Sequence, residues 1–566
     1  MKTKSRFLLP VLPALCHRMT QGLPLLLLCL CLGCGADAKK KPPALDVTKL
    51  LPQAPDDAEP KPGGIFVWGR SADATLLDPA DVTDGESVMV VTNLFDTLVA
   101  FKRGSTEIEP SLAREWTTSD DKLTWTFTLL EGIKFHDGSP LDANAVVFSF
   151  ERQRDPAHPA RRATNAFSYY QNNFKALEKV EAVDEKTVRF TLNQPYAPFL
   201  AALALFNCAI VSPTAFASEG KDADGRYKYN FAQKPVGSGP FVFESWEKDA
   251  HITLRANKDY WGGAPHIEKL VFKAVTDAQT RLKELEAGGI HGMENPELRD
   301  LALIQKNPDL RLVGGPGINV CYLAMHTGKK PFDDVRVRQA VAFAIDKKRI
   351  IATAYDNLAK PAVSMCPETM AGFSKTLLDR TRDPKRAKRL LAEAGYADGL
   401  KTTLSYPVAQ RTYLPNPGTT AIQIQQDLRE VGIEVELKRC EWSALVKETQ
   451  TGNHDMCLMG WMADIFDPDN FLYVLLDKDN AVEGVANNLS FYKGERVHEL
   501  LLAAQRTYDW HRRESLYHEA QEILHEEVPT VPLATVPDFR ALRKDVRGYS
   551  IYPAGGEFFR HVSFAR

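Results

Sequence analysis

Strand-like and helix-like segments alternate along the second half of this chain, and that alternation restricts the fold it can adopt. Residues 402–406 have the pattern of a strand, residues 422–431 repeat apolar positions at helical spacing, and residues 433–438 return to a strand pattern. The alternation extends over residues 320–529. Because strands that alternate with helices fold into a sheet covered by helices, we expect an α/β lobe in this half.

The length of the chain requires more than one lobe. It has 566 residues, of which 44% are hydrophobic and 25% are charged, as is typical of globular proteins. A single hydrophobic core stops growing at about 250–300 residues, so we expect at least two lobes. Strand patterns at residues 65–68, 123–129 and 187–192 belong to the first lobe.

The N-terminus has the pattern of a secretory leader. Basic residues precede two apolar runs, and no acidic residue occurs before Asp37. The second run ends in Cys-Leu-Gly-Cys at residues 31–34, which resembles the bacterial lipobox, whose last cysteine carries lipid. A membrane-spanning anchor is the alternative, but neither run approaches the ~20 residues that a spanning helix needs. The pattern therefore predicts lipid attachment at Cys34 and tethering to a membrane surface.

Composition excludes several other classes of protein. Residues 35–63 are rich in Lys, Pro, Asp and Ala and are expected to form a stalk, so the fold should begin near Gly64. The formal net charge is −3, and −7 without the four basic residues of the leader, which leaves no basic excess for nucleic acid. The later cysteines are far apart without CxxC spacing, which argues against zinc and against a disulfide scaffold, although one disulfide bond is compatible with them. They are Cys208, Cys321, Cys366, Cys440 and Cys457.

Two kinds of local pattern predict helices. Residues 334–348 have an apolar helical face, and we expect Arg336 and Arg338 to lie on the solvated side. Asp142 and Asp383 each precede a helical pattern and are expected to cap it. These assignments place the basic residues in solvent rather than in a binding surface.

Residues 456–471 contain the most informative carboxylate. An apolar strand pattern is expected to break at Gly460 and Trp461, and Asp464 then follows among apolar neighbours. A buried carboxylate needs a cation, which either a Lys or Arg of the chain or the ammonium of a ligand can supply. The alternative role for Asp464 is an Asx-turn that leads into the next helix. We favour the ligand.

Several motifs occur in an order typical of one family. They include Glu-Pro-Ser-Leu-Ala at residues 109–113, Phe-His-Asp-Gly at 135–138, Val-Gly-Ser-Gly-Pro-Phe at 236–241 and Pro-Phe-Asp-Asp-Val-Arg at 331–336. From Gly64 onward the chain resembles the extracellular solute-binding proteins of the oligopeptide, dipeptide and nickel class. Those proteins deliver ligand to ATP-binding-cassette (ABC) importers.

The resemblance implies an α/β, two-lobed fold of the periplasmic binding protein type, joined by a hinge. It also implies a domain order that we list by residue number. A leader (1–33) and a lipid-anchored stalk (34–63) precede lobe 1 (64–318), which includes an extra subdomain (about 100–228), and lobe 2 (319–530) is followed by a return to lobe 1 (531–566).

The resemblance also implies a ligand site for dipeptides. A zwitterion in a cleft needs a carboxylate for its ammonium and an Arg for its carboxylate. By motif, Asp464 follows Gly460 and Trp461 and takes the ammonium, whereas Arg411 takes the carboxylate with Tyr413 nearby. Extended chain spans ~3.3–3.6 Å per residue, so a fixed gap between the two would select peptide length. The resemblance also places Gly85 in a ligand-facing loop and either Tyr169 or Tyr170 over the ligand, and Trp461 and Trp442 are candidate walls of the site.

By the same resemblance the protein is a monomer without cofactor or metal, in the bacterial cell envelope, with ABC permease and ATPase subunits as partners. An enzyme is the competing class. His525-Glu526 resembles the start of a zinc protease motif, but Pro529 stands where the second His is required. Longer oligopeptides, haem, glutathione or a role in peptide sensing remain alternatives within the same fold.

Overall fold

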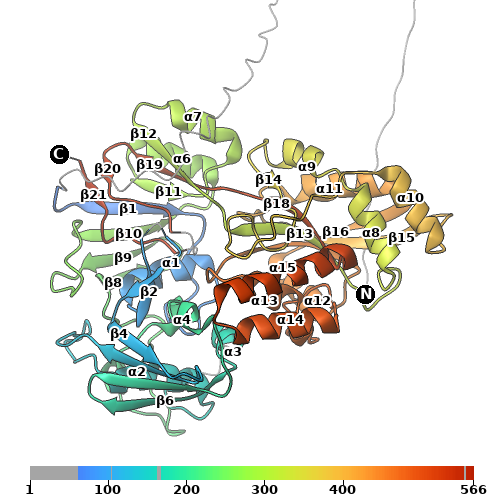
Figure 1. Cartoon of the computed structure of the whole chain (residues 1–566). Coiled ribbons are helices and arrows are strands. Elements are labelled where there is room, and N and C mark those ends of the chain that lie inside the picture. The colour runs from blue at the N-terminus through green and yellow to red at the C-terminus, as the bar shows by residue number, and fades with distance from the viewer. Residues whose placement is uncertain (1–60, 104, 162–166, 553–555, 566) are drawn as a thin grey trace, which may run out of the picture. The chain divides into compact units, whose positions relative to one another are not determined.

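The computed structural model describes residues 61–103, 105–161, 167–552 and 556–565 (Figure 1). The predicted leader, most of the predicted stalk and the predicted lipidation residue Cys34 lie outside these residues. Within the described residues, two large mixed sheets and one smaller antiparallel sheet organise the chain.

The first large sheet defines lobe 1. Its seven strands lie in the order β12 (Leu310–Gly315), β19 (Asp538–Arg543), β11 (Gly292–Glu294), β1 (Ile65–Arg70), β10 (Lys269–Ala274), β9 (His251–Ala256) and β8 (Phe241–Glu247). Alternate residues of β1 face opposite layers. Phe66 and Trp68 pack with α1 (Gly85–Leu94), whereas Val67 packs with α6 (Ala278–Ala287) and α7 (Leu301–Lys306). Short strand pairs join β2 (Val99–Phe101) to β3 (Ile108–Pro110) and β20 (Val546–Arg547) to β21 (Ser563–Phe564).

The second large sheet defines lobe 2. Its order is β14 (Lys360–Pro361), β18 (Thr530–Thr535), β13 (Asn319–Met325), β17 (Met456–Met462), β15 (Leu400–Pro407) and β16 (Ile433–Cys440). Every residue of β13 is buried because helices cover both faces of the sheet. Leu323 faces the first layer, formed by α8 (Val335–Ala344), α9 (Lys347–Ala354), α10 (Pro384–Glu393) and α11 (Pro417–Arg429). Tyr322 faces the other layer, formed by α12 (Trp442–Gln450), α13 (Asp469–Leu476), α14 (Glu495–Arg506) and α15 (Trp510–Glu527).

A four-stranded antiparallel sheet forms a separate subdomain of lobe 1. Its order is β4 (Ala113–Thr118), β5 (Thr124–Leu129), β7 (Thr187–Leu192) and β6 (Leu177–Asp184). It carries α2 (Ala143–Arg154), α3 (Ser168–Asn173), α4 (Phe199–Ala202) and α5 (Pro213–Ala217). The subdomain contacts lobe 2 directly, since the Ala197 N–H donates to the Gln505 carbonyl (2.6 Å) and the Tyr508 hydroxyl donates to the Tyr196 carbonyl (3.0 Å).

The chain crosses between the large sheets twice, and the two crossings touch each other. The first lies between β12 and β13, and the second lies between β18 and β19. The Asn319 side chain donates to the Val536 carbonyl (2.8 Å) and accepts from the Val536 N–H (3.0 Å). The boundary predicted at residue 531 falls inside β18, which pairs with β13 in the sheet of lobe 2. The chain crosses back to lobe 1 after Thr535, where β18 ends.

Several local predictions are confirmed. The strand, helix and strand expected at residues 402–438 are β15, α11 and β16, and the two strands pair in parallel. Asp142 caps α2 by accepting from the Ala145 N–H, and Asp383 caps α10 by accepting from the Arg386 N–H. The apolar patterns at residues 402–438 and the two capping residues thus form elements of the expected type.

The expectation that Arg338 is solvated is wrong. Its side chain is buried, donates to the Phe332 and Glu527 carbonyls, and pairs with the Glu527 carboxylate at 3.1 Å. The predicted helix also divides, since α8 ends at Ala344 and Asp346 caps α9. The helical spacing of apolar residues does not reveal the turn between α8 and α9. It also does not reveal that the end of α15, at Glu527, covers Arg338.

The five cysteines that follow the leader are all free thiols, and Cys440 alone among them is partly exposed. Across the described part of the chain, no helix combines the length and apolar character needed to cross a membrane.

Candidate functional site

Two adjacent parallel strands of lobe 2 position the site. β15 pairs in parallel with β17, with Leu404 opposite Met456. Their carboxyl ends therefore lie at the same edge of the sheet, where ligands bind in open α/β sheets. Arg411 follows the end of β15, and Asp464 follows the end of β17. The sheet thus brings the loops of these two residues to one edge.

Asp464 is held by side chains from both lobes. The Asn470 amide donates to its Oδ2 (3.4 Å) and accepts from its backbone N–H (3.0 Å). The Tyr169 hydroxyl, from the subdomain, donates to its Oδ1 (3.1 Å). These neutral donors orient the carboxylate without neutralising it.

The charge of Asp464 has no counterpart in the described structure. No Lys or Arg nitrogen within residues 61–565, outside the three gaps, makes an ion pair with it at 4.0 Å or less. Burial raises its pKa to about 6, and the hydrogen bonds from Asn470 and Tyr169 only partly oppose that rise. A carboxylate in this state favours a cation from outside the chain.

Asp464 does not form the Asx-turn considered as its alternative role. That turn belongs to Asp467, whose Oδ1 accepts from the Asp469 N–H (2.9 Å) just before α13. Asp467 also makes a two-bond ion pair with Arg513 of α15, at 2.6 and 2.8 Å. The chain therefore supplies a cation for Asp467, whereas Asp464 is left for another partner.

Aromatic side chains wall a cavity of about 290 Å³ that Asp464 lines, which we call the Asp464 cavity. Its other lining residues include Tyr169, Tyr322, Tyr413, Trp442, Gly460 and Trp461. Gly460 is required there because a Cβ atom would lie 2.2 Å from the Tyr413 ring. The predicted break at Gly460 and Trp461 is wrong, since β17 continues through both to Met462 and pairs with β13.

Arg411 lies beside this cavity rather than on its lining. Its guanidinium stacks 3.8 Å from the centroid of Trp442, a cation–π contact, and its buried Nε has no hydrogen-bond partner among the described residues. It lines a neighbouring cavity of about 460 Å³ together with Arg281 and Asn295 of lobe 1. Trp442, which lines the Asp464 cavity, is therefore in direct contact with Arg411.

Gly85 has a different position from the one expected. It is the exposed first residue of α1, and a Cβ atom there would meet no atom within 4 Å. It is not among the residues that line the Asp464 cavity or its neighbour. The structure therefore does not place Gly85 with Asp464 and Arg411.

Asn470 is the functional residue that sequence reasoning missed. It binds both the backbone and the carboxylate of Asp464, and its Oδ1 also accepts from the Trp461 indole N–H (3.1 Å). It is the buried second residue of α13, which begins directly after Asp467 and Pro468. A buried Asn six residues after a candidate carboxylate is the signal that could have found it.

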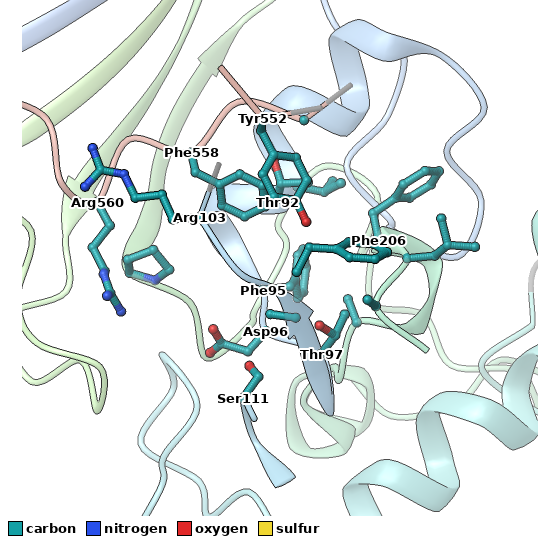
Figure 2. Close-up of a pocket in the computed structure, with 18 of the residues that line it drawn as sticks. Thr92, Phe95, Asp96, Thr97, Arg103, Ser111, Phe206, Tyr552, Phe558 and Arg560 are labelled. Atoms are coloured by element: carbon teal, nitrogen blue, oxygen red, sulfur yellow. The ribbon is translucent and has the colours of Figure 1, made fainter. Parts of the chain in front are cut away.

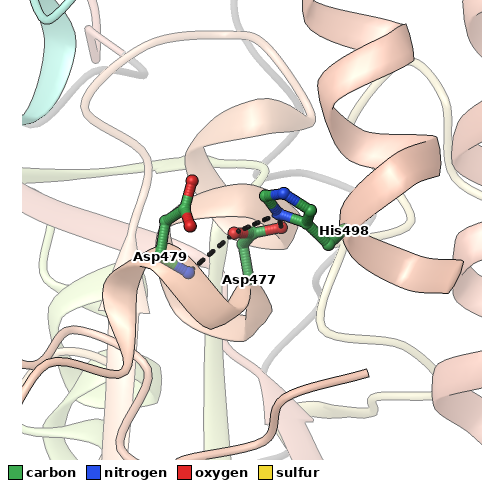
Figure 3. Close-up of side chains that lie close together, drawn as sticks. All are labelled: Asp477, Asp479 and His498. Atoms are coloured by element: carbon green, nitrogen blue, oxygen red, sulfur yellow. Dashed lines mark hydrogen bonds and ion pairs between the residues drawn. The ribbon is translucent and has the colours of Figure 1, made fainter. Parts of the chain in front are cut away.

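One cluster has side chains of the metal-binding kind. Asp477, Asp479 and His498 lie together at the end of α13 and the start of α14 (Figure 3). The His498 Nδ1 lies 3.0 Å from both carboxylate oxygens of Asp477, whose Oδ1 also accepts from the Asp479 N–H. This pairing and the turn explain the cluster without an ion.

The fold and site define a class, the two-lobed binding proteins with a ligand site at the edge of a hinged cleft. The family described as "Bacterial extracellular solute-binding proteins, family 5 Middle" matches residues 107–483, more than half of the chain. The chain is 37% identical over 504 residues to di/tripeptide-binding protein 1 of Pseudomonas aeruginosa, covering 87% of this chain and 92% of that protein. The chain belongs to family 5 of the bacterial extracellular solute-binding proteins.

Two further relatives show the range of ligands. Heme-binding protein A of Haemophilus influenzae is 35% identical over 527 residues, covering 90% of this chain and 94% of that protein. An ABC transporter-associated periplasmic binding protein of Helicobacter pylori, solved with the peptide STSA, superposes with a TM-score of 0.80. It is 37% identical and the match covers 89% of this chain and 99% of that one.

Proposed function

We propose that this protein captures dipeptides and delivers them, as a monomer, to the permease and ATPase subunits of an ABC importer. The observation that carries the proposal is the carboxylate of Asp464, which has neutral donors and no cationic partner in the described structure. The ammonium of a peptide supplies the missing charge. Relatives named for dipeptides and tripeptides support the same ligand class.

Arg411 is the proposed partner for the peptide carboxylate. Its guanidinium is oriented by the Trp442 ring, and its buried Nε is free to donate. A guanidinium fork binds a carboxylate with two parallel hydrogen bonds. Because the main chain of the peptide would pass Tyr413 and Trp442, the spacing of Asp464 and Arg411 would penalise longer peptides.

Calorimetric titration with an unblocked dipeptide, its N-acetylated form and its amidated form tests the proposal. We expect binding at micromolar or lower concentration that is lost when either terminus is blocked. Asp464→Asn should remove the preference for a free ammonium, and Arg411→Met the preference for a free carboxylate. The exposed Asp259→Asn is the matched control. Equal binding of free and blocked peptides would contradict the assignment.

Haem is the second candidate ligand, because a relative that aligns over 90% of this chain is named for it. Addition of haem followed by visible absorption spectroscopy separates the two candidates. If haem binds and excludes dipeptides, the cleft takes haem. If dipeptides bind and haem does not compete, the dipeptide proposal stands.

Attachment to a membrane through lipid on Cys34 is part of the proposal and rests on the lipobox-like sequence. We expect the protein to partition with membranes in cell fractionation and to label with a fatty acid precursor. Cys34→Ser should abolish the label and release the protein from the membrane fraction. Labelling that survives this substitution would contradict the assignment.

A further inference from the structure

A third cavity, which we call the lobe 1 cavity, lies between α1, the start of the subdomain and the C-terminal segment (Figure 2). Its volume is about 210 Å³. The aromatic residues of its lining include Phe95, Phe101, Phe206, Trp261, Tyr552 and Phe558. For comparison, an apolar cavity of about 150 Å³ can hold a benzene ring.

Asp464 connects this cavity to the site described above. It lines both the lobe 1 cavity and the Asp464 cavity. The Tyr169 ring, which lines the Asp464 cavity, packs edge to face on Phe206, which lines the lobe 1 cavity, with centroids 4.7 Å apart. Asp464 therefore belongs to the linings of both cavities, and this aromatic pair joins one lining to the other.

Two charged groups of the lobe 1 cavity, Asp96 and Arg103, already have hydrogen-bond partners. Asp96 accepts from the Ser238 and Tyr260 hydroxyls (2.8 and 2.7 Å) and from the Trp261 indole N–H (3.1 Å). Arg103 donates to the Ser550 hydroxyl (3.0 Å). In Figure 2, Arg103 and Arg560 lie on one side of the cavity and Phe206 on the other. The space beside Phe206 therefore favours an apolar group rather than a second charge.

Resting on the proposed function, we infer that the lobe 1 cavity receives the first side chain of the bound peptide and selects an aromatic one. The ammonium and the side chain of the first residue leave the same Cα atom. In this arrangement the ammonium binds Asp464 and the main chain of the peptide runs along Tyr413 and Trp442. The first side chain then enters the lobe 1 cavity, which is the apolar space next to Asp464. An aromatic ring buries more apolar surface there than any aliphatic side chain.

The isomeric dipeptides Phe-Ala and Ala-Phe test this inference, because they contain the same groups and differ only in which position is aromatic. Calorimetric titration should show Phe-Ala binding at least tenfold more tightly than Ala-Phe. Equal affinities, or tighter binding of Ala-Phe, would overturn the inference while leaving dipeptide binding established. Failure of Phe-Ala, Ala-Phe and Ala-Ala alike to bind would overturn the proposed function as well.

A cavity-filling variant gives a second readout. Ala204 lines the cavity, so Ala204→Phe should lower the ratio of Phe-Ala to Ala-Phe affinity at least tenfold. Ala201→Phe adds the same ring to a half-buried position of α4 outside the lining and should keep the ratio. An unchanged ratio in Ala204→Phe would overturn the inference. The comparison of isomers on the unsubstituted protein decides the question even if a variant fails to fold.

Discussion

Asp464 illustrates how a binding residue can be costly to the unbound protein. Its carboxylate is half-buried, it receives hydrogen bonds only from Asn470 and Tyr169 among the described residues, and its pKa rises from 3.8 to about 6. Because the raised pKa reflects lost hydration, the charged form is disfavoured in the folded protein. The ammonium of a ligand would compensate the charge of Asp464 and so offset this loss of hydration.

The first prediction concerns the pH dependence of peptide binding. Only the ionised form of Asp464 attracts an ammonium, and with a pKa of about 6 it becomes protonated as the pH falls below that value. We expect affinity to be nearly constant from pH 7 to 8 and to fall about tenfold per pH unit below 6. Titrations from pH 4.5 to 8 check this, and the affinity of Asp464→Asn should lack the transition. A transition only below pH 4 would contradict the raised pKa.

The second prediction concerns stability. A carboxyl group whose pKa is higher in the folded than in the unfolded chain stabilises the fold when protonated and destabilises it when ionised, so the cost appears as pH rises through 4 to 6. The rise to about 6 corresponds to about 3 kcal/mol at most, and partial solvent contact reduces it to about 1–2 kcal/mol. Asp464→Asn should therefore raise the free energy of unfolding at pH 8. Urea unfolding measures it, and Asp259→Asn should change nothing.

At the scale of elements, the segment before α13 is fixed by a buried ion pair. Asp467 and Arg513 join the start of α13 to α15 with two hydrogen bonds, and Arg513 also donates to the Ala504 carbonyl (2.9 Å). Asp464 lies three residues before Asp467. The position of the Asp464 carboxylate therefore depends on a pair that lies outside the lining of the Asp464 cavity.

The third prediction follows from that pair. Arg513→Met leaves the carboxylate of Asp467 buried without a cation, which costs about 3–5 kcal/mol. Urea unfolding should show this loss, and peptide affinity should fall with it. Arg496→Met removes the exposed pairs with Glu499 and Glu519 and should cost less than about 1 kcal/mol. Equal effects of the two substitutions would contradict the role given to Asp467.

The fourth prediction concerns the contact of β17 with Tyr413. Gly460→Ala places a Cβ atom where the Tyr413 ring now lies, so the ring and the loop of Arg411 must move. We expect at least a tenfold loss of dipeptide affinity by calorimetry. Gly418→Ala, in α11 with no atom within 4 Å of its Cβ, is the matched control. Unchanged affinity in Gly460→Ala would show that Tyr413 does not shape the site.

Sequence patterns predicted helices and strands better than they predicted where those helices and strands are interrupted. The βαβ unit of β15, α11 and β16 and the caps at Asp142 and Asp383 follow from local spacing, which the sequence contains directly. The continuation of β17 through Gly460 could not be predicted, because a glycine in a strand pattern usually indicates a break. Here the glycine is needed because the Tyr413 ring fills the space that a side chain at position 460 would take. Likewise the burial of Arg338 depends on the distant end of α15.

At the scale of the whole molecule, the crossings between the lobes form a paired hinge. Asn319 and Val536 join the two connections by reciprocal hydrogen bonds. Gly317 allows their close approach, since a Cβ atom there would lie 1.7 Å from the Val536 carbonyl oxygen. Hinge closure around a ligand requires only a few such residues to change conformation.

The fifth prediction tests this hinge. Gly317→Ala must separate the two connections and so alter the balance of open and closed forms. We expect small-angle X-ray scattering to show a changed radius of gyration without ligand, together with weaker peptide binding. Gly289→Ala, whose Cβ atom would make only ordinary contacts at 3.6 Å or more, should match the unsubstituted protein. Identical scattering from both variants would contradict the hinge assignment.

The relation between Asp464 and Arg411 also belongs to this scale. Their motifs are 53 positions apart in sequence, and only the parallel pairing of β15 with β17 brings their loops to one edge. Sequence spacing cannot show that Arg411 stacks on Trp442, which lines the Asp464 cavity, or that Asp464 also lines a cavity in lobe 1. Those features depend on packing between distant segments.

The place of β19 within lobe 1 has a consequence for how the molecule is made. This strand lies between β12 and β11, so it supplies a central part of a sheet whose other members are encoded before residue 316. A growing polypeptide can complete the sheet of lobe 2 by residue 535, but lobe 1 stays unfinished until residue 543 has left the ribosome. Lobe 1 therefore reaches its final form only after lobe 2, when most of the chain has been synthesised.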